Sequence, residues 1–358
     1  MGEVVKTKCK SCGSNLEYDP NSGNLKCAMC GAFYSFDKSD NYKKRNVELG
    51  SLFVVDKKED FTTAIRSCKC CGAKFSGKLM SLTSKCEYCG ATMVIDDMGV
   101  MPDACVPFAF DKAEALKLFK EEVQKRKFVN KKFKKTPKVD KIESLYIPAY
   151  SFSTDVDATY RGQLYTEDKD KDGNTSIHRF NVSGTESASF NDMLVECSEH
   201  ITQNELKSIE PFGISGARKF VPEFIYGYSV EYYNRTVEES AKIIREIVDS
   251  RTKSKILRRY DYDGINSFKV DYTYKNSKYS CMLVPVYKLH FKFKKKKYSP
   301  LVNGQNGKVG GKLPTNVGKI IWTVVLLLLG FGLLAGFVYT VATGEVPFLE
   351  EILDNFRG

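Results

Sequence analysis

The sequence is poor in histidine and tryptophan, with three of the first and one of the second among 358 residues. Because imidazole is the commonest ligand in catalytic metal centres, so few histidines argue against such a centre. His178, His200 and His290 also lie far apart, beside no nucleophile motif. The chain lacks the GxxxxGKS/T phosphate loop and the GxSxG, HExxH and GxGxxG motifs, which mark large enzyme classes. We therefore expect that it is not an enzyme.

Residues 1–10 are polar and do not have the pattern of a secretory signal peptide. The twelve cysteines are therefore expected to work in a reducing compartment, as metal-bound thiolates rather than disulfides. With 42% hydrophobic and 28% charged residues, the composition is that of a folded globular chain. The net charge of +11 favours an anionic partner without identifying it.

Eight of the cysteines form a repeated pattern. Each half has two Cys-x2-Cys pairs separated by fourteen residues, and the second half lies 59 positions after the first. A glycine follows each pair and allows the positive φ of a turn that directs two thiolates at one ion. The spacing predicts two four-cysteine zinc ribbons, with the ligands Cys9, Cys12, Cys27 and Cys30 in one and Cys68, Cys71, Cys86 and Cys89 in the other.

A closed four-thiolate site leaves no coordination position for a substrate, so both Zn²⁺ ions are expected to be structural. Disulfides and iron–sulfur ligation are weaker alternatives. The ribbon type does not by itself specify a function, and we favour protein contact or the capping of another domain over nucleic-acid binding. Cys70 is predicted to be a spare thiol, and Cys105, Cys197 and Cys281 small core residues.

Residues 320–343 form an uncharged apolar run of 24 residues, long enough to cross a hydrocarbon core of about 30 Å as a helix. Three lysines precede the run and an acidic segment, 344–358, follows it. By the positive-inside rule the N-terminal domains are cytoplasmic and this short tail lies outside. We therefore expect a single-pass, C-terminal anchor in the cell membrane.

The rest of the chain is predicted to be α+β. Asp111 with Glu114 predicts a capped helix over about 112–128, and Thr236 with Glu239 predicts a second one. Alternating apolar and polar residues predict antiparallel strands, two of which begin with the similar phrases IPAY and VPVY, a sign of a duplicated hairpin unit. The predicted domains are ribbon 1 (1–38), a linker (39–60), ribbon 2 (61–97), the capped helix and basic stretch (98–142), the β-rich α+β domain (143–300), a juxtamembrane segment (301–319), the transmembrane helix (320–343) and the tail.

Two lysine-rich stretches stand out, 125–135 and 292–297. The first is either a solvated face or an anion-binding surface. Because the second precedes the membrane run by about 22 residues, we expect it to bind the anionic inner leaflet through Lys292, Lys294, Lys295, Lys296 and Lys297.

Two clusters of acidic residues resemble functional sites, but each has a simpler structural interpretation. Asp155 and Asp157 share the polar parity of a strand, so a solvated strand face is favoured over paired catalytic carboxylates. The loop 166–175 has aspartates in the spacing of a calcium loop, but Arg179 stands where the closing glutamate belongs. A hairpin loop is the favoured interpretation.

The ordered set of features resembles a known family. It comprises the paired CxxCG ribbons, VPF (106–108) before a helix, YIPAYSFSTDVDATYRGQ (146–163), IEPF (209–212), FIYGYSVEYY (224–233), VPVY (284–287) and VNGQNGKVGGKLP (302–314). In this order it is similar to bacterial zinc-ribbon membrane proteins of the transcription-factor-IIB type, with YdjG-like members in the phage-shock (PspA-type) envelope-stress neighbourhood. The resemblance implies a membrane protein that recruits soluble partners to the inner face.

Three functions remain open from the sequence. The first is a non-enzymatic membrane-anchored adaptor or scaffold for cytoplasmic proteins, with no small-molecule substrate. The second is a membrane-tethered nucleic-acid-binding regulator, based on the stretch 125–135. The third is a zinc-thiolate redox sensor that uses Cys70.

Overall fold

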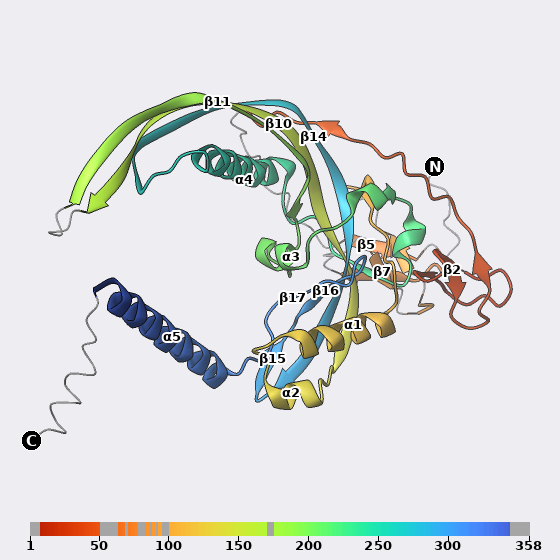
Figure 1. Cartoon of the computed structure of the whole chain (residues 1–358). Coiled ribbons are helices and arrows are strands. Elements are labelled where there is room, and N and C mark those ends of the chain that lie inside the picture. The colour runs from red at the N-terminus through yellow and green to blue at the C-terminus, as the bar shows by residue number, and fades with distance from the viewer. Residues whose placement is uncertain are drawn as a thin grey trace, which may run out of the picture.

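The structure is a computed structural model and describes residues 8–50, 64–68, 71–77, 83–85, 88–90, 92–94, 100–169 and 175–343. The fold is α+β, as expected, with one large sheet, a few helices, cysteine clusters near the N-terminus and an apolar helix near the C-terminus. Figure 1 shows three long strands curving over one helix, with the cysteine-bearing hairpins and the apolar helix on opposite sides of the view.

The large sheet has the strand order β11-β10-β14-β16-β17, and its long ladders are antiparallel, as predicted. These strands are β10 (Lys141–Lys169), β11 (Thr175–Glu196), β14 (Gly264–Phe293), β16 (Leu301–Asn303) and β17 (Val309–Gly310). Short strands at the margins are β4 (Arg45–Asn46), β9 (Ala104–Cys105), β12 (Arg218–Lys219), β13 (Ser229–Val230) and β15 (Lys296–Tyr298). The hairpin predicted at 166–175 is confirmed, because Lys169 of β10 pairs with Thr175 of β11.

The three longest strands form an arm that leaves the core. β10, β11 and β14 have 29, 22 and 30 residues, against about five or six for an average strand. The register shifts on both sides of β10 near Ser153, where Asp192 of β11 and Asn276 of β14 have φ of 51° and 52°. Bulges bend strands, and Asp and Asn tolerate this left-handed conformation. We attribute the bend of the arm in Figure 1 to these facing bulges.

α4 (Val237–Leu257) lies inside the curve of the arm (Figure 1). Thr236 and Glu239 make the predicted capping box in both directions. At the other end, Lys255 and Arg259 form ion pairs with the buried Glu186 of β11. The helix therefore ties down the concave side of the arm. Its buried positions are Ser240, Ala241, Ile244, Val248, Thr252 and Ile256.

The two similar phrases predicted to begin a duplicated hairpin unit meet in one ladder, where their first residues, Ile147 of β10 and Val284 of β14, pair with each other. β10 has a long hairpin partner in β11, whereas β14 turns back into the three-residue β15. The phrases therefore build the centre of one sheet rather than two equivalent hairpins. Their tyrosines, Tyr150 and Tyr287, are fully buried in its core.

α1 (Lys112–Lys125) begins at the predicted cap, where the carboxylate of Asp111 accepts from two backbone N–H groups. Its predicted stripe, Ala115, Phe119 and Val123, is buried. The helix ends three residues before the predicted end because the next segment pairs elsewhere: the N–H of Asn130 donates to Pro314 and that of Asn316 to Phe128. The short α2 (Lys131–Lys135) follows.

Residues 39–50, within the predicted linker, pack against the sheet. β4 pairs with the Lys278–Tyr279 part of β14, and Leu49 is buried. Arg45 forms an ion pair with Asp103, whose carboxylate also accepts from the N–H of Cys281. The predicted core cysteines Cys105, Cys197 and Cys281 are all buried; burial raises the pKa of the Cys281 thiol to about 12.

Smaller elements connect these parts. They are α3 (Gln203–Ile209), η1 (Ile214–Gly216) and η2 (Pro222–Ile225). The N-terminal hairpins comprise β1 (Leu16–Asp19), β2 (Asn24–Cys27), β3 (Phe33–Tyr34), β5 (Ala64–Ser67), β6 (Lys74–Gly77), β7 (Thr83–Lys85) and β8 (Thr92–Val94).

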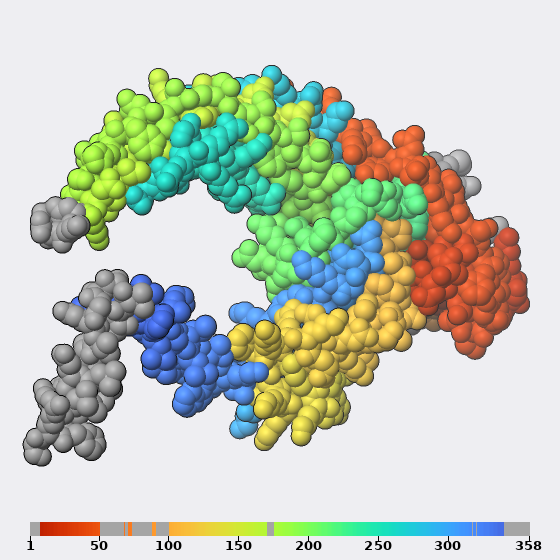
Figure 2. All heavy atoms as spheres, in the orientation of Figure 1, coloured from red at the N-terminus to blue at the C-terminus, as the bar shows by residue number. Residues whose placement is uncertain are grey.

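The C-terminal helix α5 (Val317–Thr343) is long and apolar enough to cross a membrane. Its most apolar window, Ile321–Tyr339, has a mean hydropathy of 2.5, and none of it is buried. Figure 2 shows this helix projecting from the body and separated from the arm by a wide hollow. The acidic tail predicted after it, 344–358, lies outside the described residues.

Candidate metal centres

The first cluster contains all four cysteines predicted for it. Cys9, Cys12, Cys27 and Cys30 direct their sulfur atoms at one point, with all four within 4.8 Å of one another. The Sγ atoms of Cys9 and Cys30 are 3.5 Å apart, as are those of Cys12 and Cys27. The β1-β2-β3 sheet carries this cluster, and β2 ends at Cys27. Cys9 and Cys27 are buried, whereas Cys12 and Cys30 reach the surface.

Each cysteine turn has the backbone geometry predicted from its glycine. Gly13, Gly31, Gly72 and Gly90 have φ of 73°, 73°, 75° and 66°, in the left-handed region that favours glycine. In the three turns whose first cysteine is described, the glycine N–H donates to the carbonyl of that cysteine, at 2.9 Å for Gly13, 3.0 Å for Gly31 and 2.8 Å for Gly72. The repeat seen in the sequence is therefore a repeat of turn geometry.

The electrostatics of the first cluster favour a cation. The hydroxyl of Tyr34 lies 3.2 Å from Cys9 Sγ and lowers the pKa of that thiol to about 5. The N–H of Cys30 likewise lowers the pKa of Cys27. The Ala32 N–H favours the Cys30 thiolate, but the neighbouring Cys9 and Cys27 sulfurs outweigh it and raise the pKa of Cys30 to about 12. Four thiolates this close repel one another, so full ionisation needs a bound cation.

The second cluster is described in part. Cys68, Cys71 and Cys89 bring their sulfurs within 4.8 Å of one another, and those of Cys68 and Cys89 are 3.8 Å apart. The pairing of Cys68 with Cys71 agrees with the ligands predicted from the 59-residue register. The fourth predicted ligand, Cys86, and the predicted spare thiol, Cys70, lie outside the described residues.

The two cysteine units touch each other. Lys8, just before the first cluster, donates through Nζ to the carbonyl of Cys89 at 3.2 Å. Asn15 donates through Nδ2 to the carbonyl of Gly90 at 2.9 Å, and the two side chains bond to each other at 2.7 Å. The first turn of one unit therefore holds the last turn of the other. Spacing alone cannot predict this contact, because it joins residues about 75 positions apart.

Large apolar side chains are exposed at the cysteine turns. Met29 lies between Cys27 and Cys30 and is 79% exposed, and Tyr88, beside Cys89, is 76% exposed. Phe33, two residues after Gly31, is 54% exposed. Sequence reasoning missed these three residues and Tyr34. The available signal was a large apolar or aromatic residue inside the second and fourth CxxCG turns, with two more just after the second.

The predicted lysine stretches lie together at the base of the sheet. Lys292 belongs to β14, Lys294 and Lys295 form the turn to β15, and Lys296 and Lys297 belong to β15. Phe133 of α2 stacks on Phe291 at 4.7 Å between ring centroids. The helix of the first stretch is therefore packed against the hairpin of the second.

The aspartate pair of β10 lies on a solvated strand face, as expected. Asp155 and Asp157 lie on the outer face of the arm, where Asn276 donates to Asp155 at 2.9 Å and Lys275 pairs with Asp157 at 2.6 Å. The Asn276 amide and the Lys275 ammonium lower the pKa of Asp155 and Asp157, respectively. Both therefore stay ionised at neutral pH, unlike a general acid.

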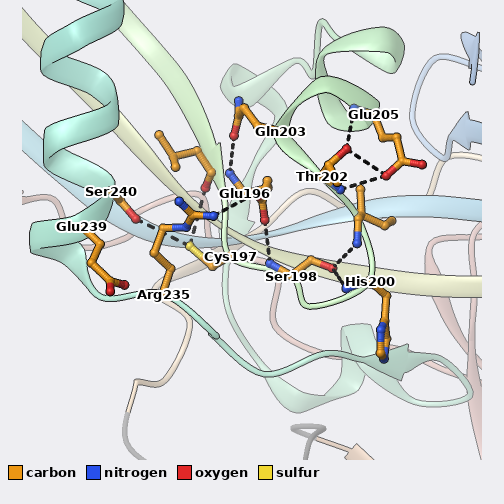
Figure 3. A network of polar contacts seen from close by, with 12 residues as sticks. Glu196, Cys197, Ser198, His200, Thr202, Gln203, Glu205, Arg235, Glu239 and Ser240 are labelled. Atoms are coloured by element: carbon orange, nitrogen blue, oxygen red, sulfur yellow. Dashed lines mark hydrogen bonds and ion pairs between the residues drawn. The ribbon is translucent and has the colours of Figure 1, made fainter. Parts of the chain in front are cut away.

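A polar network at the end of β11 is structural. In Figure 3, the carboxylate of Glu196 accepts hydrogen bonds from the Arg235 guanidinium and from the N–H of Ser198. The imidazole of His200 points away from the thiol of Cys197. Burial raises the pKa of that thiol, so it is a poor nucleophile. The network joins β11 to the starts of α3 and α4, where Thr202 with Glu205 makes another capping box.

The chain is similar to an uncharacterized protein, YdjG, of Bacillus subtilis (strain 168). The two are 24% identical over 323 residues, which cover 88% of this chain and 92% of that protein. No protein-family model and no solved structure matches the chain. Because the similarity extends over most of both chains, it supports the YdjG-like part of the resemblance.

Proposed function

We propose that this protein is a non-enzymatic, membrane-anchored zinc-ribbon adaptor that recruits cytoplasmic proteins to the inner face of the cell membrane. One observation carries the proposal: a single chain joins two cysteine clusters that could hold metal ions to an apolar helix through a large sheet. Such a layout suits a protein that holds a partner at a membrane. The relative is itself uncharacterized, so the proposal rests on the chain's own residues.

The donor set favours Zn²⁺. A tetrahedral site with zinc–sulfur distances of about 2.3 Å separates its sulfurs by about 3.8 Å. The sulfur atoms of Cys9 and Cys30, and of Cys12 and Cys27, are 3.5 Å apart in the first cluster, and those of Cys68 and Cys89 are 3.8 Å apart in the second. Four thiolates would complete the first site, and Cys86 would complete the second. A closed site of this kind supplies folding free energy and no chemistry.

The exposed apolar side chains on the cysteine turns support a role in protein contact. Met29, Phe33 and Tyr88 belong to two units that touch each other through Lys8 and Asn15. Aromatic residues and methionine are enriched at protein interfaces. We infer that the paired units present these side chains to a cytoplasmic partner.

The membrane role rests on α5, whose apolar window is unburied. We propose that α5 is a single-pass anchor, with the N-terminal domains in the cytoplasm and the short tail outside. The lysines before α5 support this orientation.

The test is affinity purification of the tagged full-length protein from membranes. We expect a specific set of cytoplasmic proteins, and loss of that set in a Met29→Ser, Phe33→Ser, Tyr88→Ser variant that keeps its metal content. The control replaces Ile177 and Ile265, exposed apolar residues on the arm, by serine. Equal recovery by the triple variant and the wild type would contradict the proposal that the cysteine turns hold the partner.

A further inference from the structure

We propose that α2 and the β14–β15 hairpin form one binding surface for anionic lipid headgroups beside the root of α5. We call it the basal lysine surface; its members are Lys131, Lys132, Lys134, Lys135, Lys292 and Lys294–Lys297. The inference rests on the proposed membrane anchor. It extends the lipid-binding role expected of the stretch 292–297 to the lysines of the stretch 125–135 that lie on α2.

Aromatic packing holds the two halves of the surface together. Phe133, the buried residue of α2, lies 4.7 Å from Phe291 and 5.4 Å from Phe293 between ring centroids. Phe291 also stacks on Tyr298 of β15, at 5.3 Å. The lysines on either side of these rings therefore share one end of the molecule, although about 160 positions separate them in sequence.

The surface lies at the point where α5 leaves the body. The segment before α5 pairs with the segment before α2 through a bridge between Val129 and Thr315. Lys319, in the first turn of α5, donates through Nζ to the carbonyl of Lys127 at 3.0 Å. Figure 1 shows α2, β15 and the start of α5 grouped together. A leaflet crossed by α5 is therefore within reach of these lysines.

The charge of the surface is not neutralised within the described part of the chain. No described carboxylate forms an ion pair with any lysine of the hairpin, and Lys292 and Lys294–Lys297 are exposed. Lys292 and Lys297 face each other directly in the ladder. Like charges in opposed positions destabilise a strand pair, so an external anion would relieve this repulsion.

The hairpin turn places lysine where the backbone favours other residues. Lys294 and Lys295 have φ of 47° and 64°, and the register of Phe293 opposite Lys296 makes them the two central residues of the turn. Such turns favour Asn-Gly, because both positions need a positive φ. Strained non-glycine residues persist at functional sites. We infer that the turn gives up local stability to present two charges.

A lipid leaflet fits the surface better than a nucleic acid does. Non-specific binding of single strands uses exposed aromatic rings on which bases stack. Here Phe133 is buried, Phe293 packs against it, and Phe128 is the one exposed ring of these three, at 38%. Flat, dense headgroup charge needs no such rings and acts within a Debye length of about 8 to 10 Å.

The test uses the full-length protein inserted into lipid nanodiscs. One set contains phosphatidylcholine alone, and in the other about a third of the lipid is phosphatidylglycerol. Trypsin cleaves after lysine, so it reports access to the basal lysine surface directly. We expect cleavage after Lys131–Lys135 and Lys294–Lys297 to slow on the order of ten-fold in the anionic discs, and to recover at high salt.

A turn variant separates binding from folding. Lys294→Asn with Lys295→Gly supplies the favoured turn, so thermal stability should rise or stay equal while protection of Lys131–Lys135 by anionic discs falls several-fold. Lys219→Gln with Lys242→Gln removes two exposed charges elsewhere and should leave protection intact. A lower melting temperature with unchanged protection in the turn variant would overturn the proposal.

Two further outcomes would overturn the proposal that the basal lysine surface binds lipid headgroups. Equal cleavage in both disc types, with the chain shown to be inserted by its co-elution with the discs, overturns lipid binding and leaves the partner experiment untouched. Protection by duplex DNA without protection by phosphatidylglycerol overturns it in favour of a nucleic acid.

Discussion

The cysteine units and the sheet obtain their order in different ways. The first unit has three buried apolar residues in its hairpin, Leu16, Tyr18 and Leu25, too few to fold so small a unit alone. The sheet has a continuous core in which tyrosines such as Tyr146, Tyr150 and Tyr287 are fully buried. A metal ion bound by the cysteines would therefore be decisive for the order of the first cysteine unit and irrelevant to that of the sheet.

The two regions nevertheless share contacts. Tyr18 of β1 packs on Phe224 at 5.5 Å between ring centroids, and its N–H donates to the carbonyl of Tyr226. Asn21, in the β1–β2 turn, donates to Asp111 at the start of α1. The first cysteine unit is therefore docked on the core of the sheet, whereas the order inside the unit depends on the proposed metal ion.

Removing the metal should have the largest effect. A strong chelator, or Cys9→Ser with Cys27→Ser, should unfold the first cysteine unit, because the binding free energy of such sites, about 10 to 16 kcal/mol in zinc peptides, is also folding free energy. Hydrogen exchange should rise throughout 8–34 and stay slow in β10 and β14. Cys70→Ser, which removes the predicted spare thiol, should keep two bound ions by elemental analysis. Global unfolding on chelation would show that the metal supports the whole molecule.

Arg45→Met should have the next largest effect, and it acts on the sheet side. Asp103, whose side chain is 7% exposed, would lose its cation, and a buried carboxylate left unpaired costs about 3 kcal/mol. Arg218→Met is the matched control, since its partner Asp40 is 80% exposed, and it should cost less than about 1 kcal/mol. Urea melts of both variants measure the difference. Equal losses would mean that β4 contributes little to the sheet.

Structural features that depend on a few neighbouring residues could be predicted from the sequence. A CxxCG turn needs five residues, and the capping box of Thr236 with Glu239 needs four, so both were recognisable. The length and bend of the arm could not be predicted, because they depend on pairing between residues more than a hundred positions apart, such as Thr159 and Asp271. For the same reason the packing of Phe133 on Phe291, which joins the two lysine stretches, has no local signal.

Replacing Asp111 should have the smallest effect and should fall on the contact between the two regions. The carboxylate caps α1 and accepts from Asn21 at 3.2 Å, so Asp111→Ala should cost about 1 kcal/mol and raise hydrogen exchange in the β1–β2 turn. Asp140→Ala, at an exposed position that caps no helix, removes the same charge and should do neither.

The stability that the Asp111 carboxylate contributes should depend on pH in a definite direction. The N–H of Glu114, followed by the Asn21 amide, lowers the pKa of Asp111 in the folded protein. A carboxyl group with a lowered folded pKa stabilises the fold above its unfolded pKa of about 3.9, and that stability disappears as the pH falls through the folded value. The stability difference between wild type and Asp111→Asn, which keeps a capping oxygen, should therefore be constant at neutral pH and shrink below about pH 4. A difference that grows on acidification would mean that Asp111 does not hold α1 and the cysteine unit through its charge.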